Sequence, residues 1–348
     1  AGRFVPADEA ELAEFLATST GSVRPVGFGH SFSPLVPTDG HLVVIDQLTG
    51  LLDHDPDAMT ATFAAGTRLG DMGAPLQQVG QAMLNLPDID RQSLAGAIAT
   101  ATHGTGIDFT SLSGMVTNLR LITPAGEVLD LSEATRPEMF AAACVSLGAL
   151  GIITRVTLKN RTPYRLKARS WVQPIEEVLE SFDEMAANHR HFEMFPLVHC
   201  DYAQVLSIDE TDEPINNPPP LPEEAESFGQ MLKLVSATPV MLRKPLLNLI
   251  AGQIEPSEVV DASYRILSNV RNDRFNEMEY SVPLDAGAEC LREILRTIED
   301  EAVDVVFPLE YRYVKRDNTW LGMSSGCLLY TSPSPRDIHH NLVFRLVL

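Results

Sequence analysis

Basic residues are scarce in this sequence. Its 348 residues include 26 Lys and Arg against 47 Asp and Glu, which gives a formal net charge of -21. Proteins that bind nucleic acids present basic faces, and anionic membrane surfaces attract basic segments. We therefore expect neither a nucleic acid nor a membrane surface as a partner, and a solvated acidic exterior is the simplest interpretation of the charge.

Cysteines are also rare, and long apolar runs are missing. The four cysteines, Cys144, Cys200, Cys290 and Cys327, lie far apart, a spacing that indicates neither a disulfide framework nor a metal site. No apolar run reaches the roughly 20 residues of a membrane-spanning helix, and no secretory signal opens the chain. We expect a cytoplasmic protein without a metal. Because Ala1 rather than Met comes first, we expect the natural N-terminus to lie upstream.

One stretch gives the first indication of a ligand. Residues 23–33 read VRPVGFGHSFS, a β-prone run that ends in two glycines, a histidine and a serine. Glycines there let the backbone turn tightly and approach a ligand closely, and free N–H groups in such a turn can hold a pyrophosphate. The Rossmann fingerprint needs a third glycine and an immediate helix, and neither follows here. An ordinary strand and turn is the alternative.

Two further stretches are rich in glycine, small residues and hydroxyls. Residues 85–106 read NLPDIDRQSLAGAIATATHGTG, and residues 146–154 read SLGALGIIT. Taken together, in this order and spacing, the three stretches resemble the FAD-binding half of the vanillyl-alcohol-oxidase-type flavoproteins. Within that group the chain is most similar to the aldonolactone and alditol oxidases. The resemblance covers nearly all of residues 1–326, and only the combination of the three stretches is specific.

The resemblance implies an α+β protein with two domains. A PCMH-type FAD-binding domain of two subdomains would occupy residues 1–160, and an α+β cap, or substrate, domain with an antiparallel sheet would occupy residues 161–326. Short strands and short helices without an internal repeat favour this class over a doubly wound sheet. The 348-residue chain is long enough for two such cores.

The end of the sequence fits this scheme poorly. Residues 327–337 show no secondary-structure period, and they can be back-translated into a string that resembles a sequencing adaptor. We therefore expect residues 327–348 to be a non-native tail, with a natural tail rich in serine and proline as the alternative. The catalytic lysine, or His-Trp-Gly-Lys run, that the resemblance implies downstream of Gly326 is missing, so we expect the natural C-terminal segment to be missing too.

Apolar periodicity predicts the individual elements. The predicted helices are 8–17, 69–79, 138–146, 174–188, 231–249 with interruptions near Pro239 and Pro245, and 285–298. The predicted strands are 23–26, 41–45, 60–64, a hairpin of 118–122 and 126–129, 152–158, a pair of 192–198 and 203–208, 277–282, and 303–309. Residues 209–226 are acidic and rich in proline, which predicts a mobile loop.

The resemblance also implies the cofactor and the residues that bind it. These are Val26, Gly27, Phe28, Gly29, His30, Ser31, Phe32, Asn85, Ser93, Gly96, Thr100, Ala101, Thr102, His103 and Ile153. Small residues let the main chain lie against a flat ring, and main-chain N–H groups there would stabilise an anionic reduced flavin. His30 would carry the FAD covalently, with a merely hydrogen-bonding histidine as the alternative. For His103 the alternative is a buried structural histidine.

Glu310 and Arg312 are the predicted catalytic residues. They lie two positions apart in residues 307–314, FPLEYRYV, so their side chains share one face of a strand. A carboxylate beside a guanidinium can hold a polyol or a lactone through charge-assisted bonds, and the arginine would stabilise an alkoxide as hydride leaves carbon. A surface ion pair is the alternative. Residues 276–283, NEMEYSVP, resemble the cap of sugar-lactone oxidases.

Together these features predict an FAD-dependent oxidase that acts on the CH–OH group of a sugar-derived alcohol. An aldono-1,4-lactone is the expected substrate, with hydride transfer to flavin N5 and with O₂, or another electron acceptor, as the oxidant. The O₂ reaction would give H₂O₂. An open-chain alditol is the alternative substrate. A non-catalytic flavin- or sugar-binding protein on the same scaffold is the alternative function.

Overall fold

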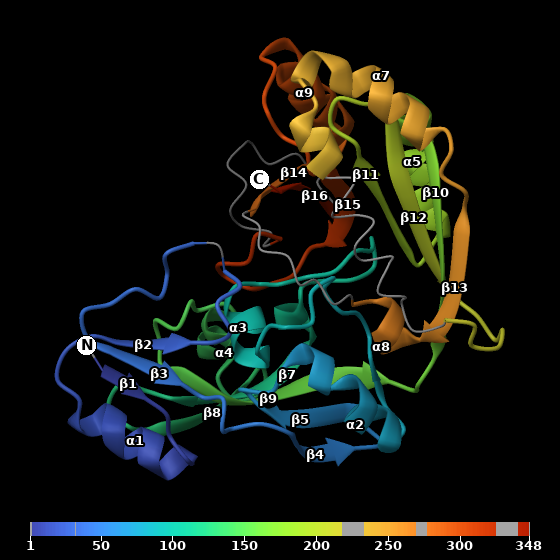
Figure 1. Cartoon of the computed structure of the whole chain (residues 1–348). Coiled ribbons are helices and arrows are strands. Elements are labelled where there is room, and N and C mark those ends of the chain that lie inside the picture. Colours follow the sequence, from blue (N-terminus) through green and yellow to red (C-terminus); the bar gives the residue numbers. More distant parts are fainter. Residues whose placement is uncertain (1, 32, 218–232, 269–276, 325–339, 348) are drawn as a thin grey trace.

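A computed structural model of the chain describes residues 2–31, 33–217, 233–268, 277–324 and 340–347, the last of these as backbone only. Figure 1 shows two lobes. The first lobe, drawn in blue and green, runs from β1 to β9, and the second lobe holds the strands that follow. Leu166 and Ile208 of the second lobe belong to the apolar core of the first, so the lobes pack against each other at this end.

The first lobe contains two sheets. The smaller is parallel, with β3 between β1 and β2, and Phe4 of β1 stacks on Phe15 of α1. The larger is antiparallel in the order β4-β5-β9-β7-β8, and β6 pairs with β9. The bounds are β1 (Gly2–Phe4), α1 (Glu9–Thr18), β2 (Val23–Val26), β3 (His41–Val44), β4 (Leu51–Asp55), β5 (Thr60–Ala64), β6 (Ala82–Met83), β7 (Val116–Ile122), β8 (Val128–Ser132) and β9 (Ile152–Arg161).

Short helices connect these strands, and local sequence explains where they begin. Asp8 caps α1 by accepting a hydrogen bond from the Glu11 N–H, and Ser93 caps α3 in the same way through the Gly96 N–H. Pro137 occupies the first turn of α4, a favoured position because its missing N–H needs no partner there. The bounds are η1 (Leu69–Asp71), α2 (Gly73–Gln78), α3 (Leu94–Ala99), η2 (Leu112–Met115) and α4 (Pro137–Cys144).

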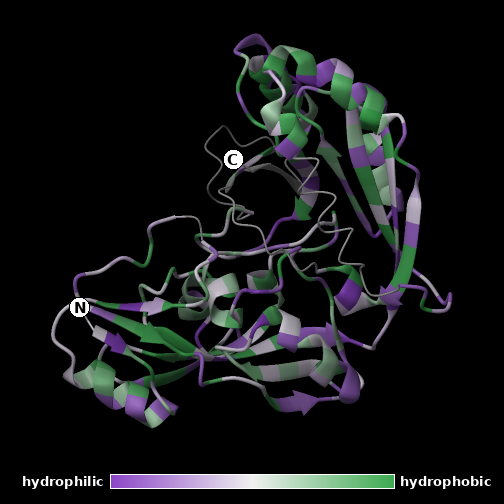
Figure 2. Cartoon of the chain, viewed as in Figure 1, coloured by the Kyte–Doolittle hydropathy of each residue, from purple (hydrophilic) through white to green (hydrophobic). Residues whose placement is uncertain are grey.

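A seven-stranded antiparallel sheet forms the second lobe, in the order β13-β10-β12-β11-β15-β16-β14. Its strands are β10 (Arg165–Pro174), β11 (His191–Pro196), β12 (Tyr202–Glu210), β13 (Ser257–Ala262), β14 (Glu277–Pro283), β15 (Leu309–Lys315) and β16 (His340–Val347). Its helices are α5 (Ile175–Asn188), α7 (Val240–Ala251), α8 (Ser263–Ile266), η3 (Leu284–Ala286) and α9 (Gly287–Asp300). In Figure 2, α7 and α9 carry both apolar and polar bands, as helices with one buried face do.

One face of this sheet packs under helices, and this fixes what the other face can present. Phe182 of α5 makes an edge contact with Tyr311 of β15 at a centroid distance of 4.6 Å. Because side chains alternate along a strand, Glu310 and Arg312 point to the opposite face. That face is turned toward the first lobe, since Glu193 of β11 accepts a hydrogen bond from Thr105.

Mixed helices and antiparallel sheets confirm the predicted α+β class. Two predicted strands, 23–26 and 60–64, have the bounds of β2 and β5. The predicted helix 69–79 divides into η1 and α2, because Gly73 lies against the Tyr264 ring and marks a break in the helix.

The predicted helix 231–249 was expected to be interrupted near two prolines. The interruption at Pro239 is confirmed, but the one at Pro245 is wrong, since α7 continues through it. Met241, whose carbonyl would pair with residue 245, is 89% exposed, so water can serve that carbonyl.

The predicted strand 303–309 is also wrong. The strand begins at Leu309 and ends at Lys315. Val303 instead bonds back to the Ile298 carbonyl at the end of α9, and Pro308 has no N–H for a strand ladder.

The predicted loop 209–226 is confirmed over residues 211–217, which form no helix or strand, but β12 extends to Glu210. The Asn216 N–H donates to the Val260 carbonyl of β13 over 3.0 Å, which anchors this part of the loop, and its mobility stays a prediction. The rest of the predicted loop, from residue 218 on, lies outside the described residues. Residues 340–347 form β16 between β15 and β14, whereas 325–339 lie outside the description, so the non-native origin of residues 327–348 stays a prediction.

Among the described residues, no helix is long and apolar enough to cross a membrane. The same residues contain no group of three or more His, Cys, Asp or Glu side chains that could hold a metal ion.

Candidate active site

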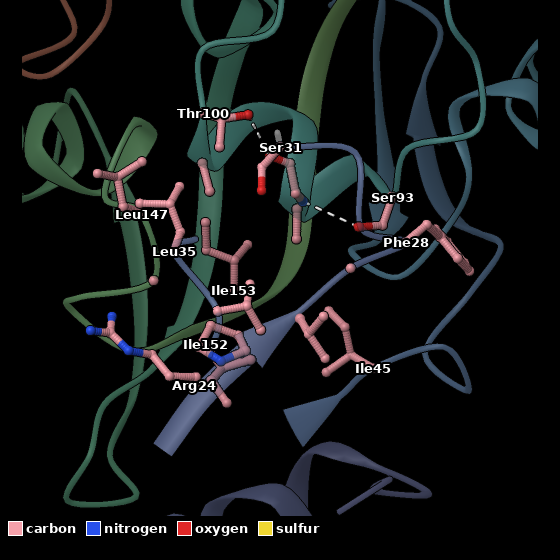
Figure 3. A pocket seen from close by; sticks show the side chains of 18 of the residues that line it. Arg24, Phe28, Ser31, Leu35, Ile45, Ser93, Thr100, Leu147, Ile152 and Ile153 are labelled. Carbon is pink, nitrogen blue, oxygen red and sulfur yellow. Dashed lines mark hydrogen bonds between the residues drawn. The ribbon is translucent and has the colours of Figure 1, made fainter. Parts of the chain in front are cut away.

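A cleft in the first lobe brings the three glycine-rich stretches together. It holds about 970 Å³ of empty space, and most of its lining comes from residues 24–36, 92–100 and 146–153. Figure 3 shows Ser93 and Thr100 near one end of this cleft, and Ile45, Ile152 and Ile153 toward the other. We call it the first cleft. The apolar end of the first cleft can take a flat aromatic group such as a nucleotide base, and its hydroxyl-rich end can take polar groups.

Two glycines shape the wall of the first cleft. Gly29 has a φ of +79°, in the left-handed region that favours glycine, and a Cβ there would meet no protein atom within 4 Å. A Cβ on Gly27 would lie 2.5 Å from the Ser93 hydroxyl, so this glycine lets the turn pack against the start of α3. The backbone of the turn therefore lies open to a ligand at one glycine and close to α3 at the other.

A second cleft lies between the lobes. It holds about 1480 Å³ of empty space. Its lining includes residues 87–89, Gln92 and residues 100–103 of the first lobe, and residues 278–280 and Arg312 of the second. Six residues line both clefts: His30, Ser31, Leu35, Gln92, Thr100 and Leu147. The two clefts are therefore neighbours with a common wall, and His30 stands where they meet.

The predicted cofactor residues are distributed along these clefts. Val26, Gly27, Phe28, Gly29, Ser93, Gly96 and Ile153 line the first cleft; Ala101, Thr102 and His103 line the second; His30, Ser31 and Thr100 line both. Asn85 lines neither. Its buried amide donates to the Thr105 carbonyl and accepts from the Leu86 N–H, so it braces the 103–106 segment from behind. Phe32 lies outside the described residues.

His103 joins the two lobes. Its Nε2 lies 2.6 Å from Glu279 Oε1 on β14, and its Nδ1 lies 3.0 Å from the Gly104 carbonyl. A carbonyl can only accept, so Nδ1 is the donor to Gly104, and Nε2 faces the Glu279 carboxyl group. His103 is buried with a partner on each ring nitrogen, as the alternative of a structural histidine requires, and it also lines the second cleft together with Glu279.

The pair Glu310 and Arg312 is buried. Arg312 Nη1 lies 2.5 Å from Glu310 Oε1, and the two residues are 3% and 6% exposed respectively. The predicted common face is thus confirmed, and the alternative of a surface pair is wrong. Arg312 lines the second cleft and also approaches Glu279 Oε2 at 3.9 Å, whereas Glu310 does not line the cleft. Glu310 therefore contacts a residue that lines the cleft without lining it itself.

Comparison with known proteins identifies the chain's family. Residues 156–333 match the family model described as D-arabinono-1,4-lactone oxidase, and residues 1–132 match an FAD binding domain. L-gulono-1,4-lactone dehydrogenase of Mycobacterium tuberculosis (strain H37Rv) is 35% identical over 332 residues, which are 92% of this chain and 76% of that protein. The chain belongs to the D-arabinono-1,4-lactone oxidase family. It is an FAD-dependent oxidoreductase.

More distant relatives are consistent with this family and with the fold. L-gulonolactone oxidase of Bos taurus is 26% identical over 332 residues, covering 91% of this chain and 74% of that protein. Cholesterol oxidase from Brevibacterium sterolicum has a TM-score of 0.76 with 17% identity, over 99% of this chain and 76% of that one. The second likeness shows that this lactone oxidase homologue shares the fold of that oxidase.

The residues present in this lactone oxidase homologue fit FAD. The first cleft offers an exposed glycine turn, apolar walls and hydroxyls, and the second cleft adjoins it along six shared residues. An elongated ligand with a nucleotide at one end and a flat ring at the other suits two adjoining clefts. Residues 26–31, 93–100 and Ile153 would hold the nucleotide end, and residues 100–103 the ring.

Sequence reasoning did not single out two carboxylates of this site. Glu279 on β14 was visible only as part of the cap-like run 276–283. Glu193 lies in HFEMFP, where a lone carboxylate interrupts an apolar strand, and that interruption was the available signal. The pKa of Glu193 is raised to about 7, chiefly by burial and then by the Glu310 charge, while Arg312 and the Thr105 hydrogen bond oppose the shift.

Proposed function

We propose that this protein oxidises a CH–OH group of an aldono-1,4-lactone. The observation that carries this proposal is the lining of the second cleft, where Arg312, Glu279 and His103 lie beside residues 100–102. Arginine supplies several N–H donors and a carboxylate supplies acceptors, which suits a neutral ligand with several hydroxyls and a lactone carbonyl. Family membership, and the lactones named for its relatives, support the same substrate class.

Bound FAD would supply the acceptor for the hydride that leaves the substrate carbon. The chain's own residues would handle charge and proton. Arg312 would hold the substrate oxygen and stabilise the negative charge that develops as the hydroxyl loses its proton. Glu310 keeps the guanidinium in place from behind. Glu279, which lines the same cleft, would accept the hydroxyl proton.

We also propose that the FAD is tethered through His30. His30 lines both clefts, and its pKa is lowered from the ordinary value by burial and then by the Arg91 charge. A neutral imidazole has a nitrogen lone pair, which the formation of a covalent bond requires. These two features support the tether, and acid precipitation tests it directly, as argued below.

The electron acceptor is proposed to be O₂. The names of the relatives include both an oxidase and a dehydrogenase, so the acceptor needs its own measurement. Purified flavin-loaded protein would be mixed with lactone under air while H₂O₂ is recorded, and separately without O₂ in the presence of an artificial dye. Rapid H₂O₂ release supports the oxidase proposal, and dye reduction without H₂O₂ would replace it by a dehydrogenase.

The substrate class is tested by anaerobic bleaching of the flavin absorbance. A panel of aldono-1,4-lactones and the matching open-chain alditols would be added one at a time. We expect the lactones to bleach the flavin faster than the alditols. Bleaching by alditols alone would move the substrate to that class, and no bleaching by either would favour a non-catalytic flavin- or sugar-binding protein.

A further inference from the structure

The end of β15 runs beside a segment of the first lobe. The Gly106 N–H donates to the Tyr313 carbonyl over 2.9 Å, and the Lys315 N–H donates to the Phe109 carbonyl over 2.9 Å. These contacts continue the strand past Arg312, the residue of β15 that lines the second cleft. Main-chain hydrogen bonds therefore join the two lobes directly beyond the proposed catalytic arginine.

Asp317 makes the next connection between the lobes, and it does so with its side chain. The carboxyl group belongs to a residue that is 6% exposed. The Ser111 hydroxyl of the first lobe donates to Oδ2 over 2.5 Å. Thr319 donates to Oδ1 twice, from its hydroxyl over 2.6 Å and from its N–H over 3.1 Å. Three donors thus meet one buried carboxyl group, which suits a carboxylate that only accepts hydrogen bonds.

Asp317 also shapes the loop that follows β15. Its N–H donates to the Ser324 carbonyl over 3.2 Å, and this hydrogen bond closes residues 317–324 into a loop. Asp317 and Ser324 are buried at the base of the loop, whereas Leu321 and Met323 are 56% and 40% exposed and line the second cleft. The Asp317 carboxyl group therefore anchors a part of the cleft lining.

On the other side, Ser111 connects Asp317 to residues 100–103, the segment expected to lie against the flavin ring. Ser111 caps η2, where its oxygen accepts a hydrogen bond from the Gly114 N–H. The next residue, Leu112, donates its N–H to the Thr102 carbonyl over 2.9 Å. Thr102 lines the second cleft. Two hydrogen bonds and the start of η2 thus lead from the Asp317 carboxyl group to the flavin-ring segment.

We propose that Asp317 is a positioning residue that sets the place of the flavin-ring segment relative to Arg312. Its backbone continues from the strand that carries Arg312, and its side chain holds η2, which holds Thr102. This inference rests on the proposed function, because the spacing matters through the hydride transfer. A misplacement of about 1 Å can slow a reaction on the order of a hundredfold. We therefore expect the rate of flavin reduction to depend on Asp317 more than lactone affinity does.

The first test needs no substrate. Visible circular dichroism of the flavin-loaded protein reports the asymmetry of the surroundings of the ring, and it would be compared between Asp317→Asn and Asp261→Asn. Asp261 is 2% exposed, accepts hydrogen bonds within the second lobe and lines neither cleft, so it controls for the loss of a buried carboxyl group. We expect both variants to keep their flavin and only Asp317→Asn to change its spectrum. An unchanged spectrum of folded Asp317→Asn, or an equal change in both variants, would overturn the proposal.

The second test separates the rate of flavin reduction from lactone binding, by stopped-flow absorbance over a range of lactone concentrations. Asp317→Asn is expected to lower the limiting rate about tenfold or more, and to change the lactone dissociation constant less than about threefold. Asp261→Asn is expected to leave both values unchanged. A weaker affinity at an unchanged limiting rate in Asp317→Asn would contradict the proposal. If no lactone reduces the flavin of the unaltered protein, the proposed function fails, and circular dichroism still decides the role of Asp317.

Ser111→Ala tests the route through η2 and keeps the Asp317 carboxyl group. It removes one of the three hydrogen bonds to that group, so the limiting rate is expected to fall, but less than in Asp317→Asn. Because both substitutions break the same contact, the double variant is expected to be about as slow as Asp317→Asn alone. Losses that multiply in the double variant would overturn the proposal. If Asp317→Asn does not fold, Ser111→Ala carries both tests, and an unchanged spectrum and rate in that variant would overturn the proposal.

Discussion

His103 Nε2 lies 2.6 Å from Glu279 Oε1, and this contact crosses the second cleft from the first lobe to β14. The other carboxylate oxygen, Glu279 Oε2, approaches Arg312. One carboxylate therefore links the segment expected to lie against the flavin ring with the arginine expected to hold the substrate. The contact therefore holds a residue of the first lobe against a strand of the second at the wall of the cleft.

The first prediction concerns the strength of this link. A double-mutant cycle with His103→Asn and Glu279→Gln is expected to give a coupling energy of about 1 kcal/mol or more in the free energy of unfolding, measured in urea. Both side chains are mostly buried, at 5% and 19% exposure. The exposed pair Arg292 and Glu176 serves as the control, with an expected coupling below about 0.5 kcal/mol. Additive effects at His103 and Glu279 would show that the contact does not hold the lobes together.

The second prediction concerns Glu9, the first residue of α1. Its carboxylate accepts hydrogen bonds from Arg155 and Thr154 and lies near Arg120. Burial alone would raise the pKa of Glu9, but these partners outweigh it and the pKa lies below its ordinary value. A depressed carboxyl pKa stabilises the folded state above the unfolded pKa, and this stabilisation is lost as pH falls through the folded pKa.

Glu9→Gln is therefore expected to cost about 1 kcal/mol in the free energy of unfolding at neutral pH, a modest value because solvent reaches the site. The difference from the unaltered protein is expected to shrink as the pH falls below about 4.5. Glu14→Gln, on the exposed side of the same helix, is the control. A difference that stays constant with pH would refute the role of the Glu9 charge.

Local sequence patterns made some features of the fold and of the candidate site predictable. The i, i+2 spacing of Glu310 and Arg312 fixes a common face in any strand, and the structure has them 2.5 Å apart. The alternation over residues 60–64 gave the bounds of β5 because that strand is half-buried on one side. In both cases the deciding information lies within a few residues of sequence.

The remaining features of the fold and the site depend on residues that are distant from one another in the sequence. His103 and Glu279 are 176 positions apart, and no local period indicates that they meet. β10 was not predicted, although Arg165, Lys167 and Arg169 alternate along it with Leu166 and Ala168. The ion pairs of Lys167 and Arg169 with Glu258 on β13 satisfy those charges. That Glu193 lies opposite Arg312 follows only from the register of β11 and β15, which the sequence does not indicate.

The third prediction concerns the proposed tether. Flavin-loaded protein is expected to keep its flavin after acid precipitation, and His30→Ala is expected to release it into the supernatant while the fold persists. His54→Ala, an exposed histidine of β4, is the control and is expected to behave like the unaltered protein. Flavin absorbance in the supernatant of the unaltered protein would disprove the covalent bond while leaving FAD binding intact.

The fourth prediction concerns Arg312. Arg312→Lys keeps a positive charge but loses the planar fork that can bind two oxygens at once. The substitution is expected to slow flavin reduction by lactone at least tenfold while the flavin content stays the same. Arg296→Lys, on the exposed face of α9, is the control for a general effect of the substitution. An unchanged reduction rate, followed by stopped-flow absorbance, would assign Arg312 a structural role only.

The last prediction tests the glycine turn as a ligand-binding wall. Gly29 has a φ of +79° and its Cβ would project into open space, so Gly29→Ala adds backbone strain of about 1–2 kcal/mol and a methyl group beside the first cleft. Gly50 has a φ of +102°, also with no atom within 4 Å of a Cβ, and it does not line that cleft. Gly50→Ala therefore carries a similar strain without the obstruction. We expect both variants to lose similar stability to urea, and only Gly29→Ala to lose flavin content. Equal flavin content in the two variants would mean that the turn does not approach the cofactor.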